Sequence, residues 1–480
     1  MAELNGSLQL TPEKETNMSR TKRTRGPGGV AVAALLVVSL AGCDDLLSVE
    51  NPASLLDEDL ERPELLATLA ATPEANISGT MSSLNSRSGL LSDELLHPST
   101  QLENVDAMSG NRLAANSGVE GHWRGLAQAR WLADEVAGKL TAAGSAAEDI
   151  ARANFWGGTA RFAMADHYNV IVYDENDSPR GPIQVITDGI ARFEAAASAA
   201  AGADANLQAA SLGQVARGYR SLYFEGIHLN GSTDANLMAQ AESNARAALA
   251  ANGDYNVSLQ YGAPGGSNGV ASLGGPNGGI NRIDGAVYNF LPDPVTGNWD
   301  PRIPHSWGNV AEDLESLGSD FGSAGTNLKF SDRSDPLPMS RAAEAMLIIA
   351  EARLLAGDLA EAVVWINNTR AAAITRVSAS GYAGGAARGW PPQTSVLSDL
   401  QDFASSDADD IYAQLKHERQ AEFFLELRRW PDMRYYRIVP ARWLAPNVAA
   451  GMDLRWPPAP EEVAQNPNLS LDQTRSVFGS

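Results

Sequence analysis

Apolar residues recur every three or four positions over most of the chain, and stretches that alternate apolar and polar residues are scarce. This spacing is typical of amphipathic helices. In residues 121–140, apolar positions from Trp123 to Leu140 fall near one stripe, with Trp131 at its edge. We therefore expect a mostly helical chain, with helices over residues 121–140, 147–168, 190–201, 207–226, 234–251, 340–356, 359–373 and about 409–430.

Residues 340–373 have the pattern of a helical hairpin. Gly357 suits the left-handed conformation that ends a helix, and Asp358 can cap the next helix. The spacing of small and large residues through both helices resembles a tetratricopeptide hairpin, and three or four such hairpins are expected at irregular intervals. The predicted fold class is all-α: tetratricopeptide-like helical hairpins with long irregular loop inserts, in one domain over residues 43–480.

Two segments, about 252–330 and about 378–398, lack the helical pattern. The first is dense in Gly, Asn, Ser and Pro and includes "GAPGGSNGVASLGGPNGG". An insert this long inside a domain is unusual and often functional. A disordered linker is the alternative, but such linkers are poor in aromatic residues. This segment contains Tyr255, Tyr261, Tyr288, Phe290, Trp299 and Trp307.

Cys43 is the only cysteine in the chain. A disulfide within the chain is therefore excluded, and a zinc site built from several thiolates is nearly excluded. A nucleophilic thiol needs a lowered pKa, whereas the neighbouring Asp44 and Asp45 would raise it. Covalent modification is the interpretation that remains.

The residues before Cys43 support modification. A short basic region, residues 18–25, precedes an apolar run of 11 residues, 30–40, which is too short to span a membrane and suits a signal-peptide core. Leu40-Ala41-Gly42-Cys43 resembles the lipobox of bacterial lipoproteins, in which the signal is cut before the cysteine and the sulfur receives diacylglycerol. A chance Ala-Gly-Cys after a core helix is the alternative. We predict a signal peptide over 18–42 and a lipidated Cys43. Residues 1–17 precede a usable start, Met18, and are expected to be untranslated or non-structural.

The charge of the predicted mature chain excludes one class of partner. Removal of residues 1–42 takes away five of the 36 Lys and Arg residues and three of the 58 Asp and Glu residues, which leaves 31 basic and 55 acidic residues and a net charge of −24. Such a chain is not expected to bind nucleic acid or anionic lipid. The lipid on Cys43 is the only membrane anchor predicted.

Motifs of known catalytic and metal sites are missing from the sequence. There is no HExxH, P-loop or GxSxG motif, and the six histidines are scattered. Residues 174–177 begin like a calcium loop, but Pro179 occupies the position that requires glycine. We interpret them as a surface turn, and we predict no metal, no cofactor and no catalytic residue. Carboxylates are numerous, so the sequence does not exclude a catalytic pair of the kind that glycosidases use, but no feature identifies which two residues would form it.

Residues 415–437, "LKHERQAEFFLELRRWPDMRYYR", combine charged and aromatic residues. In one helix, Glu422, Glu426 and Arg429 would share a face and form a charged network beside an aromatic core. A ligand or catalytic cluster is one interpretation. The favoured one is structural: an ion-paired helix that locks the C-terminal region to the hairpins.

Four motifs occur in order along the chain: the lipobox with "DLLSV" in residues 40–49; Arg341, "AEA", "GD" and "IN" up to Arg370 in residues 338–373; "ERQAE" and "ELRRWPDMR" in residues 418–434; and "WPPAPE" with "NPNL" in residues 456–469. Together they resemble the SusD/RagB family of surface lipoproteins from Bacteroidota-type bacteria. Ala459 stands where the family usually has Ile, and Pro431 follows the Trp. These departures bear on packing.

The resemblance implies a non-enzymatic nutrient-binding lipoprotein, lipid-anchored in the outer membrane and facing the cell surface. It would sit as a lid on a SusC-like TonB-dependent transporter and hand it oligosaccharides or peptides. The hairpins would act mostly as scaffold and contact the transporter, and loops would hold the ligand, often on flat aromatic platforms.

Aromatic side chains of the inserts are the candidate ligand-binding residues. A sugar ring stacks its C–H face on such a ring, while its hydroxyls need amide and carboxylate partners. Each candidate has an alternative role, which is to pack the insert against the hairpins. The candidates are Tyr255, Tyr261, Tyr288, Trp299 and Trp307, with Trp390 as a further one. Tryptophans on predicted helices, namely Trp123, Trp131, Trp156 and Trp365, are expected in the core.

Two other functions stay open. A surface glycoside hydrolase requires two carboxylates at a defined separation in one cleft. A tetratricopeptide-like scaffold for protein assembly requires an open concave face.

Overall fold

The structure is a computed structural model, and it describes residues 63–97, 101–110, 117–174, 176–262, 266–274, 281–283, 291–298, 300–303, 305–306, 326–327, 329–330, 332–380, 400–439 and 455–469. The chain divides into two units, Met1–Asp59 and Leu60–Ser480. Every described residue lies in the second unit.

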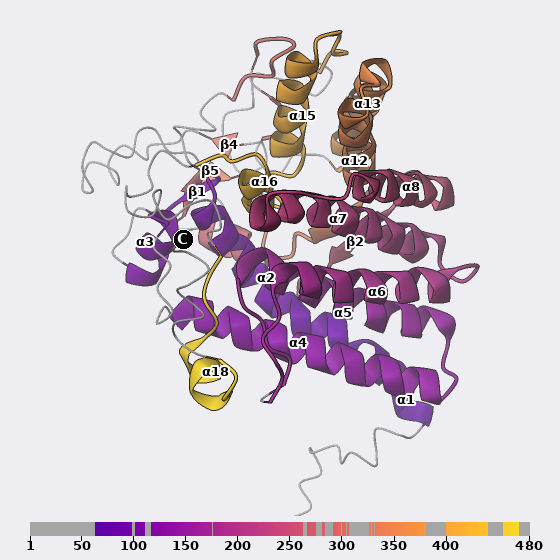
Figure 1. Ribbon diagram of the computed structural model, residues 1–480, viewed down its shortest axis with the longest axis vertical. Coiled ribbons are helices and arrows are strands. Elements are labelled where there is room, and N and C mark those ends of the chain that lie inside the picture. Colours follow the sequence, from indigo (N-terminus) through magenta and orange to yellow (C-terminus); the bar gives the residue numbers. More distant parts are fainter. Residues whose placement is uncertain are drawn as a thin grey trace, which may run out of the picture. The chain divides into compact units, whose positions relative to one another are not determined.

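Helices that follow one another in sequence pack side by side (Figure 1). The stack runs from α4 (Ser117–Ala142) through α5 (Ala147–His167), α6 (Pro182–Ala200) and α7 (Ala205–Asn230) to α8 (Asn236–Ala251). Next, α8 packs against α12 (Ala342–Leu355), which forms a hairpin with α13 (Leu359–Ser380). This arrangement confirms the predicted fold class of helical hairpins.

The other described elements cover the stack or link its parts. The helices α1 (Pro63–Ala70) and α2 (Thr72–Leu91) pack against α4 and α5, and α2 also contacts α3 (Leu102–Met108) and α9 (Gly269–Gly274). Near the C-terminus lie α15 (Ala408–Glu422), which packs against α12 and α13, then α16 (Arg429–Tyr435) and α18 (Pro460–Gln465).

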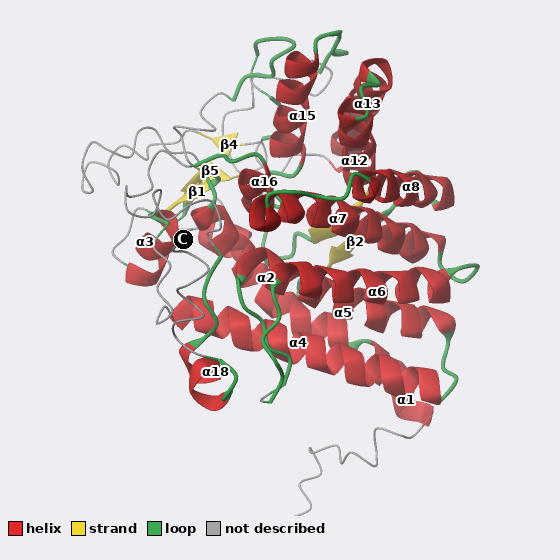
Figure 2. Cartoon of the chain, in the orientation of Figure 1, coloured by secondary structure: helices red, strands yellow, loops and turns green. Residues whose placement is uncertain are grey.

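The strands are short and form three antiparallel pairs among the described residues (Figure 2). They are β1 (Leu95–Leu96) with β3 (Arg282–Ile283), β2 (Asn256–Leu259) with β6 (Leu337–Arg341), and β4 (His305–Ser306) with β5 (Thr326–Asn327). The longest pair, β2–β6, joins the start of the loop-rich insert to the residue before α12.

The predicted capping of the α12–α13 hairpin is confirmed. Gly357 has a φ of +82°, in the left-handed region that glycine adopts without a steric penalty. The carboxylate of Asp358 accepts a hydrogen bond from the Glu361 backbone N–H at 3.2 Å, as an N-cap does. Local sequence signals therefore set both ends of this turn.

The helix predicted over 190–201 begins earlier, at Pro182, and ends at Ala200. Gly189 lies inside this helix, at a position where a side chain would not fit. A Cβ there would lie 2.7 Å from Cδ1 of Phe162 on α5. The glycine therefore serves close helix packing and does not mark a helix start.

The prediction of one long helix over residues 409–430 is wrong. The helix α15 ends at Glu422, and Leu425 and Leu427 have φ values of +57° and +62°. Long-range hydrogen bonds hold this turn: the Leu425 N–H donates to Glu94 at 2.6 Å, and its C=O accepts from Asn85 at 2.8 Å. Tertiary contacts thus override the helical pattern of the local sequence.

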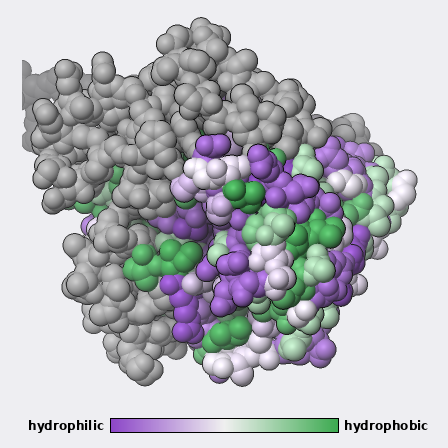
Figure 3. Space-filling model, turned by 90° about the horizontal axis from the view of Figure 1, so that it is seen from above, coloured by the Kyte–Doolittle hydropathy of each residue, from purple (hydrophilic) through white to green (hydrophobic). Residues whose placement is uncertain are grey.

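Most of the helical tryptophans lie where the pattern predicts. Trp123 and Trp156 are buried, and Trp365 is partly buried against the core. Trp131 is a correction: it is 52% exposed, because its position at the edge of the α4 stripe faces solvent. Figure 3 views the molecule from above the orientation of Figure 1, and over the described part of the face that it shows, hydrophobic and hydrophilic residues are intermixed. In the part of the chain that the structure describes, no helix has the length and apolar character to cross a membrane.

Gly158 tests the close packing of α5 against α6. A Cβ at this position would lie 2.8 Å from Cε2 of Phe193, whereas a Cβ at Gly138 on α4 would meet nothing within 4 Å. Gly158→Ala is expected to lower the free energy of unfolding by ~1–3 kcal/mol through overpacking. Gly138→Ala, the control, is expected to raise it by ~0.5–1 kcal/mol because alanine favours a helix. Urea unfolding of both variants measures the difference, and a stabilised Gly158→Ala would contradict the packing described.

Candidate functional site

The structure tests two of the six candidate ligand-binding residues. Tyr288, Trp299, Trp307 and Trp390 lie outside the described residues, as does Cys43. Tyr255 and Tyr261 are described, and their side chains are buried, 1% and 9% exposed.

Burial corrects the prediction for these two tyrosines. The backbone C=O of Tyr255 accepts from the Ala342 N–H at 3.0 Å beside the β2–β6 pair, and its ring lies in the core, where Gly213 leaves room for it. The Tyr261 hydroxyl donates to the Ser78 C=O at 3.2 Å. Both rings pack the start of the insert against the helices, which is the alternative role stated above, and neither offers an open face to a ligand.

A buried ion-pair cluster anchors the later part of the insert, residues 291–303. Arg370 of α13 donates to both carboxylate oxygens of Asp293, each at 2.9 Å, and to Glu418 of α15 at 2.7 Å. Arg302 donates to Asp300 at 2.9 and 2.6 Å and to the second oxygen of Glu418 at 2.5 Å. Glu418 therefore bridges two arginines, one from a helix and one from the insert. We call these residues, with His417, the insert anchor.

The anchored segment forms a closed turn. The N–H of Asp293 donates to the Asn298 C=O at 2.7 Å, and the N–H of Asp300 donates to the Leu291 C=O at 2.9 Å. Gly297 closes the tip with a φ of +69°. Asp293 and Asp300 are buried while Pro294, Gly297 and Asn298 are exposed, so the acidic residues fix the base and the tip faces solvent.

The charges of the insert anchor are matched within it. Burial acts to raise the pKa of Asp300, but Arg302 and His417 hold the pKa of that carboxyl well below its usual value. Burial also acts on Asp293, and the hydrogen bonds and charge of Arg370 lower its pKa. Both carboxylates are therefore ionised at neutral pH and paired with guanidinium groups.

Asp293, Asp300 and His417 also have the geometry of a possible metal site, because their ligand atoms lie within 4.8 Å of one another. Arg370 and Arg302 already occupy the oxygens of both carboxylates. His417 Nε2 lies 2.8 Å from Asp300 Oδ2. Two buried guanidinium groups supply the positive charge that a metal ion would bring, so the donor set fits an ion-pair cluster and not a metal centre.

A second buried cluster holds the turn between α15 and α16. Arg341, at the end of β6, donates to Glu426 at 2.8 and 3.0 Å and also bonds Glu422. Lys329, at the end of the insert, lies 2.7 Å from Glu426 and donates to the Phe424 C=O at 2.7 Å. The cations that pair with Glu422 and Glu426 therefore come from outside residues 415–437.

The predicted role of Arg429 in this cluster is wrong. Arg429 donates to both oxygens of Asp93, at 2.7 and 2.6 Å. Because the helix ends at Glu422, Arg429 does not share a helical face with Glu422 and Glu426. The buried pairs nevertheless support the structural interpretation of this segment.

Comparison with solved structures confirms the fold. A SusD superfamily protein from Bacteroides vulgatus matches with a TM-score of 0.60 at 14% identity, over 84% of this chain and 97% of that chain. A SusD homolog from Bacteroides thetaiotaomicron matches with a TM-score of 0.61 at 14% identity, over 87% of this chain and 98% of that chain. Residues 319–476 match the model of the SusD family. The chain is therefore similar to the SusD family, in its fold over most of its length and in the family pattern over this C-terminal third.

One further solved structure with a similar fold has a ligand in its description. A structure described as solved with xylogluco-oligosaccharide matches with a TM-score of 0.54 at 14% identity, over 81% of this chain and 85% of that chain. No curated protein matches this chain. At such low identities the likeness shows the fold.

Sequence reasoning missed the insert anchor of this SusD-like fold. Asp293 and Asp300 each precede a proline, in the two Asp-Pro dipeptides of "LPDPVTGNWDPR". Such dipeptides favour turns, which is a signal for the closed turn but not for burial. Arg370 belongs to the family-like motif quoted above, yet its partners on the insert are not adjacent in sequence.

Removal of Arg370 tests whether the insert anchor fixes the base of the turn. Arg370→Ala leaves Asp293 and Glu418 short of a buried partner and is expected to lower the free energy of unfolding by ~3–5 kcal/mol. Denaturant unfolding gives this value, and proteolysis within residues 291–303 is expected to accelerate.

The control for this prediction is Arg124→Ala. Arg124 pairs with Glu461 at 2.9 Å, but the two side chains are 64% and 56% exposed, and solvent screens such pairs. The unfolding midpoint is expected to change little. Equal effects of the two substitutions would show that the insert anchor does not hold the turn.

Proposed function

We propose that this chain binds oligosaccharides at the tip of the loop-rich insert and does not cleave them. The observation that carries the proposal is the match of residues 319–476 to the SusD family model, in a fold shared with a structure solved with xylogluco-oligosaccharide. The insert anchor supports it, because a turn with a buried ionic base can present its tip to solvent without the entropic cost of ordering a free loop on binding.

The aromatic residues that remain candidates are Tyr288, Trp299, Trp307 and Trp390. Trp299 directly precedes the anchored Asp300 in the sequence. A few exposed rings with hydrogen bonds would give dissociation constants of roughly micromolar to millimolar, because each ring buries at most about 150–250 Å². Weak binding suits a protein that must release its cargo.

Binding is favoured over catalysis by the state of the described carboxylates in the insert. Glycoside hydrolysis needs one carboxyl with a raised pKa beside an ionised one, in an open cleft. Asp293 and Asp300 are instead buried, lowered in pKa and paired with arginine.

We further propose that the chain is a lipoprotein anchored through Cys43 in the outer membrane, facing the cell surface. It would pass its ligand to a SusC-like TonB-dependent transporter. The lipobox-like Leu40-Ala41-Gly42-Cys43 after an apolar run supports the anchor. The several acyl chains of a bacterial lipoprotein hold a protein firmly on a membrane, whereas one chain holds it marginally.

The ligand site is tested with a glycan and peptide array and a parallel turnover assay on the purified chain. Trp299→Ala and Trp307→Ala are expected to abolish or weaken glycan binding by at least roughly tenfold, with an unchanged melting temperature. The control is Trp131→Ala, which removes an exposed tryptophan from α4. Normal binding by both insert variants would refute the assigned site. Turnover abolished by a single Asp or Glu change would refute the binding function.

The anchor is tested in the native host. The chain is expected to partition with the outer membrane, to carry lipid on the Cys43 sulfur by mass spectrometry, and to be shaved from intact cells by external protease. Cys43→Ser is expected to leave the protein unlipidated and absent from the membrane fraction. An unmodified Cys43 thiol on membrane-bound wild-type protein would contradict the proposal.

A further inference from the structure

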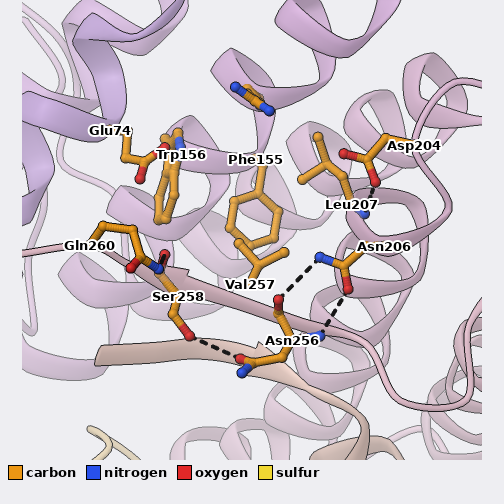
Figure 4. A pocket seen from close by; sticks show the side chains of 11 residues that line it. Glu74, Phe155, Trp156, Asp204, Asn206, Leu207, Asn256, Val257, Ser258 and Gln260 are labelled. Atoms are coloured by element: carbon orange, nitrogen blue, oxygen red, sulfur yellow. Dashed lines mark hydrogen bonds between the residues drawn. The ribbon is translucent and has the colours of Figure 1, made fainter. Parts of the chain in front are cut away.

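The cavity of about 350 Å³ beside β2 offers no open face to a ligand (Figure 4). Phe155 and Leu207, which form part of its apolar wall, are 0% and 4% exposed. The Asn206 carboxamide donates to the Asn256 C=O at 3.1 Å and accepts from the Asn256 N–H at 3.0 Å. The Ser258 hydroxyl donates to Asn256 Oδ1 at 2.9 Å. These polar groups thus bind one another. A buried group without a matching partner lies elsewhere, beside the turn between α15 and α16.

That group is the carboxyl of Glu94, which is 1% exposed. In the described part of the chain, every other buried carboxylate lies within 4.0 Å of a Lys or Arg nitrogen. Among the same described residues, no such nitrogen lies within that distance of Glu94. Because burial of an unpaired charge is costly, the environment favours the neutral, protonated form of Glu94.

The charged groups that face Glu94 do not reverse this preference. Its neighbour Asp93 is negative and accepts from Arg429 at 2.7 and 2.6 Å. Lys329 lies 2.7 Å from an oxygen of Glu426, with which it is paired. The C-terminal end of α2, which lies just before Glu94, carries the negative pole of the helix dipole.

These effects place the titration of Glu94 near neutral pH. Burial raises the pKa of Glu94 to about 7, and the charge of Asp93 acts in the same direction. The Leu425 N–H, Arg429 and Lys329 act to lower it.

The hydrogen bonds at Glu94 also suit a carboxylic acid. Its Oε1 accepts from the Leu425 N–H at 2.6 Å, and its Oε2 lies 3.3 Å from the Ser92 hydroxyl, which lies 3.2 Å from the Gly89 C=O. A hydroxyl has one proton, so Ser92 cannot donate to Glu94 and Gly89 at once. With a proton on Oε2, Glu94 donates to Ser92, and Ser92 donates to Gly89. The proton therefore completes a chain of hydrogen bonds from Glu94 to the last turn of α2.

Glu94 holds a turn that in turn holds the end of the loop-rich insert. Leu425 has a φ of +57°, and its N–H is bound by Glu94 while its C=O accepts from Asn85 at 2.8 Å. The C=O of the preceding residue, Phe424, accepts from Lys329 Nζ at 2.7 Å. Lys329 lies at the end of the insert. A change at Glu94 thus acts on the backbone to which Lys329 is bound.

We propose that Glu94 is a proton switch that sets how tightly the end of the loop-rich insert is held. With the proton in place, the chain through Ser92 is complete and the turn is closed. Release of the proton to solvent leaves an unpaired negative charge in the core. This charge attracts Lys329 away from Glu426 and the Phe424 C=O, so the turn and the end of the insert loosen. The switch does not depend on ligand binding by the insert.

The pH dependence of unfolding tests the protonation state. The folded chain keeps the Glu94 proton up to about pH 7, whereas the unfolded chain releases it near 4.5, so stability falls as the pH rises between these values. This one group is expected to raise the unfolding equilibrium constant roughly fiftyfold from pH 5 to pH 8.

Glu94→Gln isolates this contribution, because its amide oxygen can accept from the Leu425 N–H and its amide nitrogen can donate to Ser92, as the protonated acid does. In urea unfolding, the variant is expected to match the wild type at pH 5. At pH 8 its unfolding constant is expected to be roughly fiftyfold lower than that of the wild type.

Glu344→Gln is the matched control. Glu344 is buried and accepts from Arg428 at 2.9 and 3.0 Å, and this arginine acts to lower its pKa against the effect of burial. The control variant is therefore expected to be less stable than the wild type at both pH values. If Glu94→Gln does not fold, infrared spectra of the wild type decide the result, through a carboxylic-acid C=O band that disappears with a midpoint near pH 7.

Hydrogen exchange measures the effect on the insert. In the wild type, peptides that contain Leu425 or Lys329 are expected to exchange at least roughly tenfold faster at pH 8 than at pH 6, after correction for the intrinsic pH dependence. The same peptides of Glu94→Gln, and peptides from α6 in both proteins, are expected to show no such change.

Three outcomes would overturn the proposal: the wild type and Glu94→Gln share one pH dependence of stability, Glu94→Gln is destabilised at pH 8 as the control is, or the two insert-end peptides respond to pH equally in both proteins. An acid band missing from the wild type at pH 6 would do the same. None of these measurements involves a ligand, so they are independent of the proposed function.

Discussion

Buried pairing between guanidinium and carboxylate groups is the interaction on which the described structure depends. Asp432 of α16 accepts from Arg220 of α7 at 2.9 Å and from Arg419 of α15 at 2.8 Å, and Arg220 also bonds Glu351 of α12. The same pattern recurs between Arg428 and Glu344, Arg429 and Asp93, and Arg455 and Glu225. Desolvation offsets much of the Coulomb energy of each pair, but a buried charge without its partner costs several kcal/mol, about 3–5. The pairs therefore discriminate strongly against wrong arrangements of the C-terminal segment.

The turn between α15 and α16 shows how this discrimination shapes the backbone. A non-glycine residue in the left-handed region costs about 1–2 kcal/mol, and both Leu425 and Leu427 adopt it. Side chains from α2 and from just before β1 hold Leu425 at its N–H and its C=O. Burial raises the pKa of Glu94 to about 7, and the negative charge of Asp93 acts in the same direction. The hydrogen bond from the Leu425 N–H acts to lower this pKa. The strain is maintained because several buried partners specify the same geometry.

The sequence predicts what local signals determine and fails where distant partners decide. Helix periodicity and the Gly357-Asp358 turn are local, and they were predicted correctly. The end of α15 depends on Asn85, 340 residues from its partner Leu425, and no local pattern contains that contact. Arg370 and Asp293 are 77 residues apart, and Asp293 lies in a segment that lacks the helical pattern, so no local signal joins them. Tyr255 is a candidate ligand residue by sequence because it is an aromatic residue of the loop-rich insert, whereas in the structure its ring lies in the core beside the β2–β6 pair.

The same principle extends to the strand pair β2–β6, which connects the ion-paired region to the start of the loop-rich insert. Asn256 of β2 stands opposite Arg341 of β6, and Arg341 is the residue that bonds Glu422 and Glu426. A bulge between Val257 and Ser258 shifts the register of the pair, and one register step would turn each side chain of β2 to the other face. The buried position of Arg341 fixes the end of β6, and β6 fixes β2. The ionic contacts of Arg341 thus stabilise the register in which the start of the insert pairs with β6.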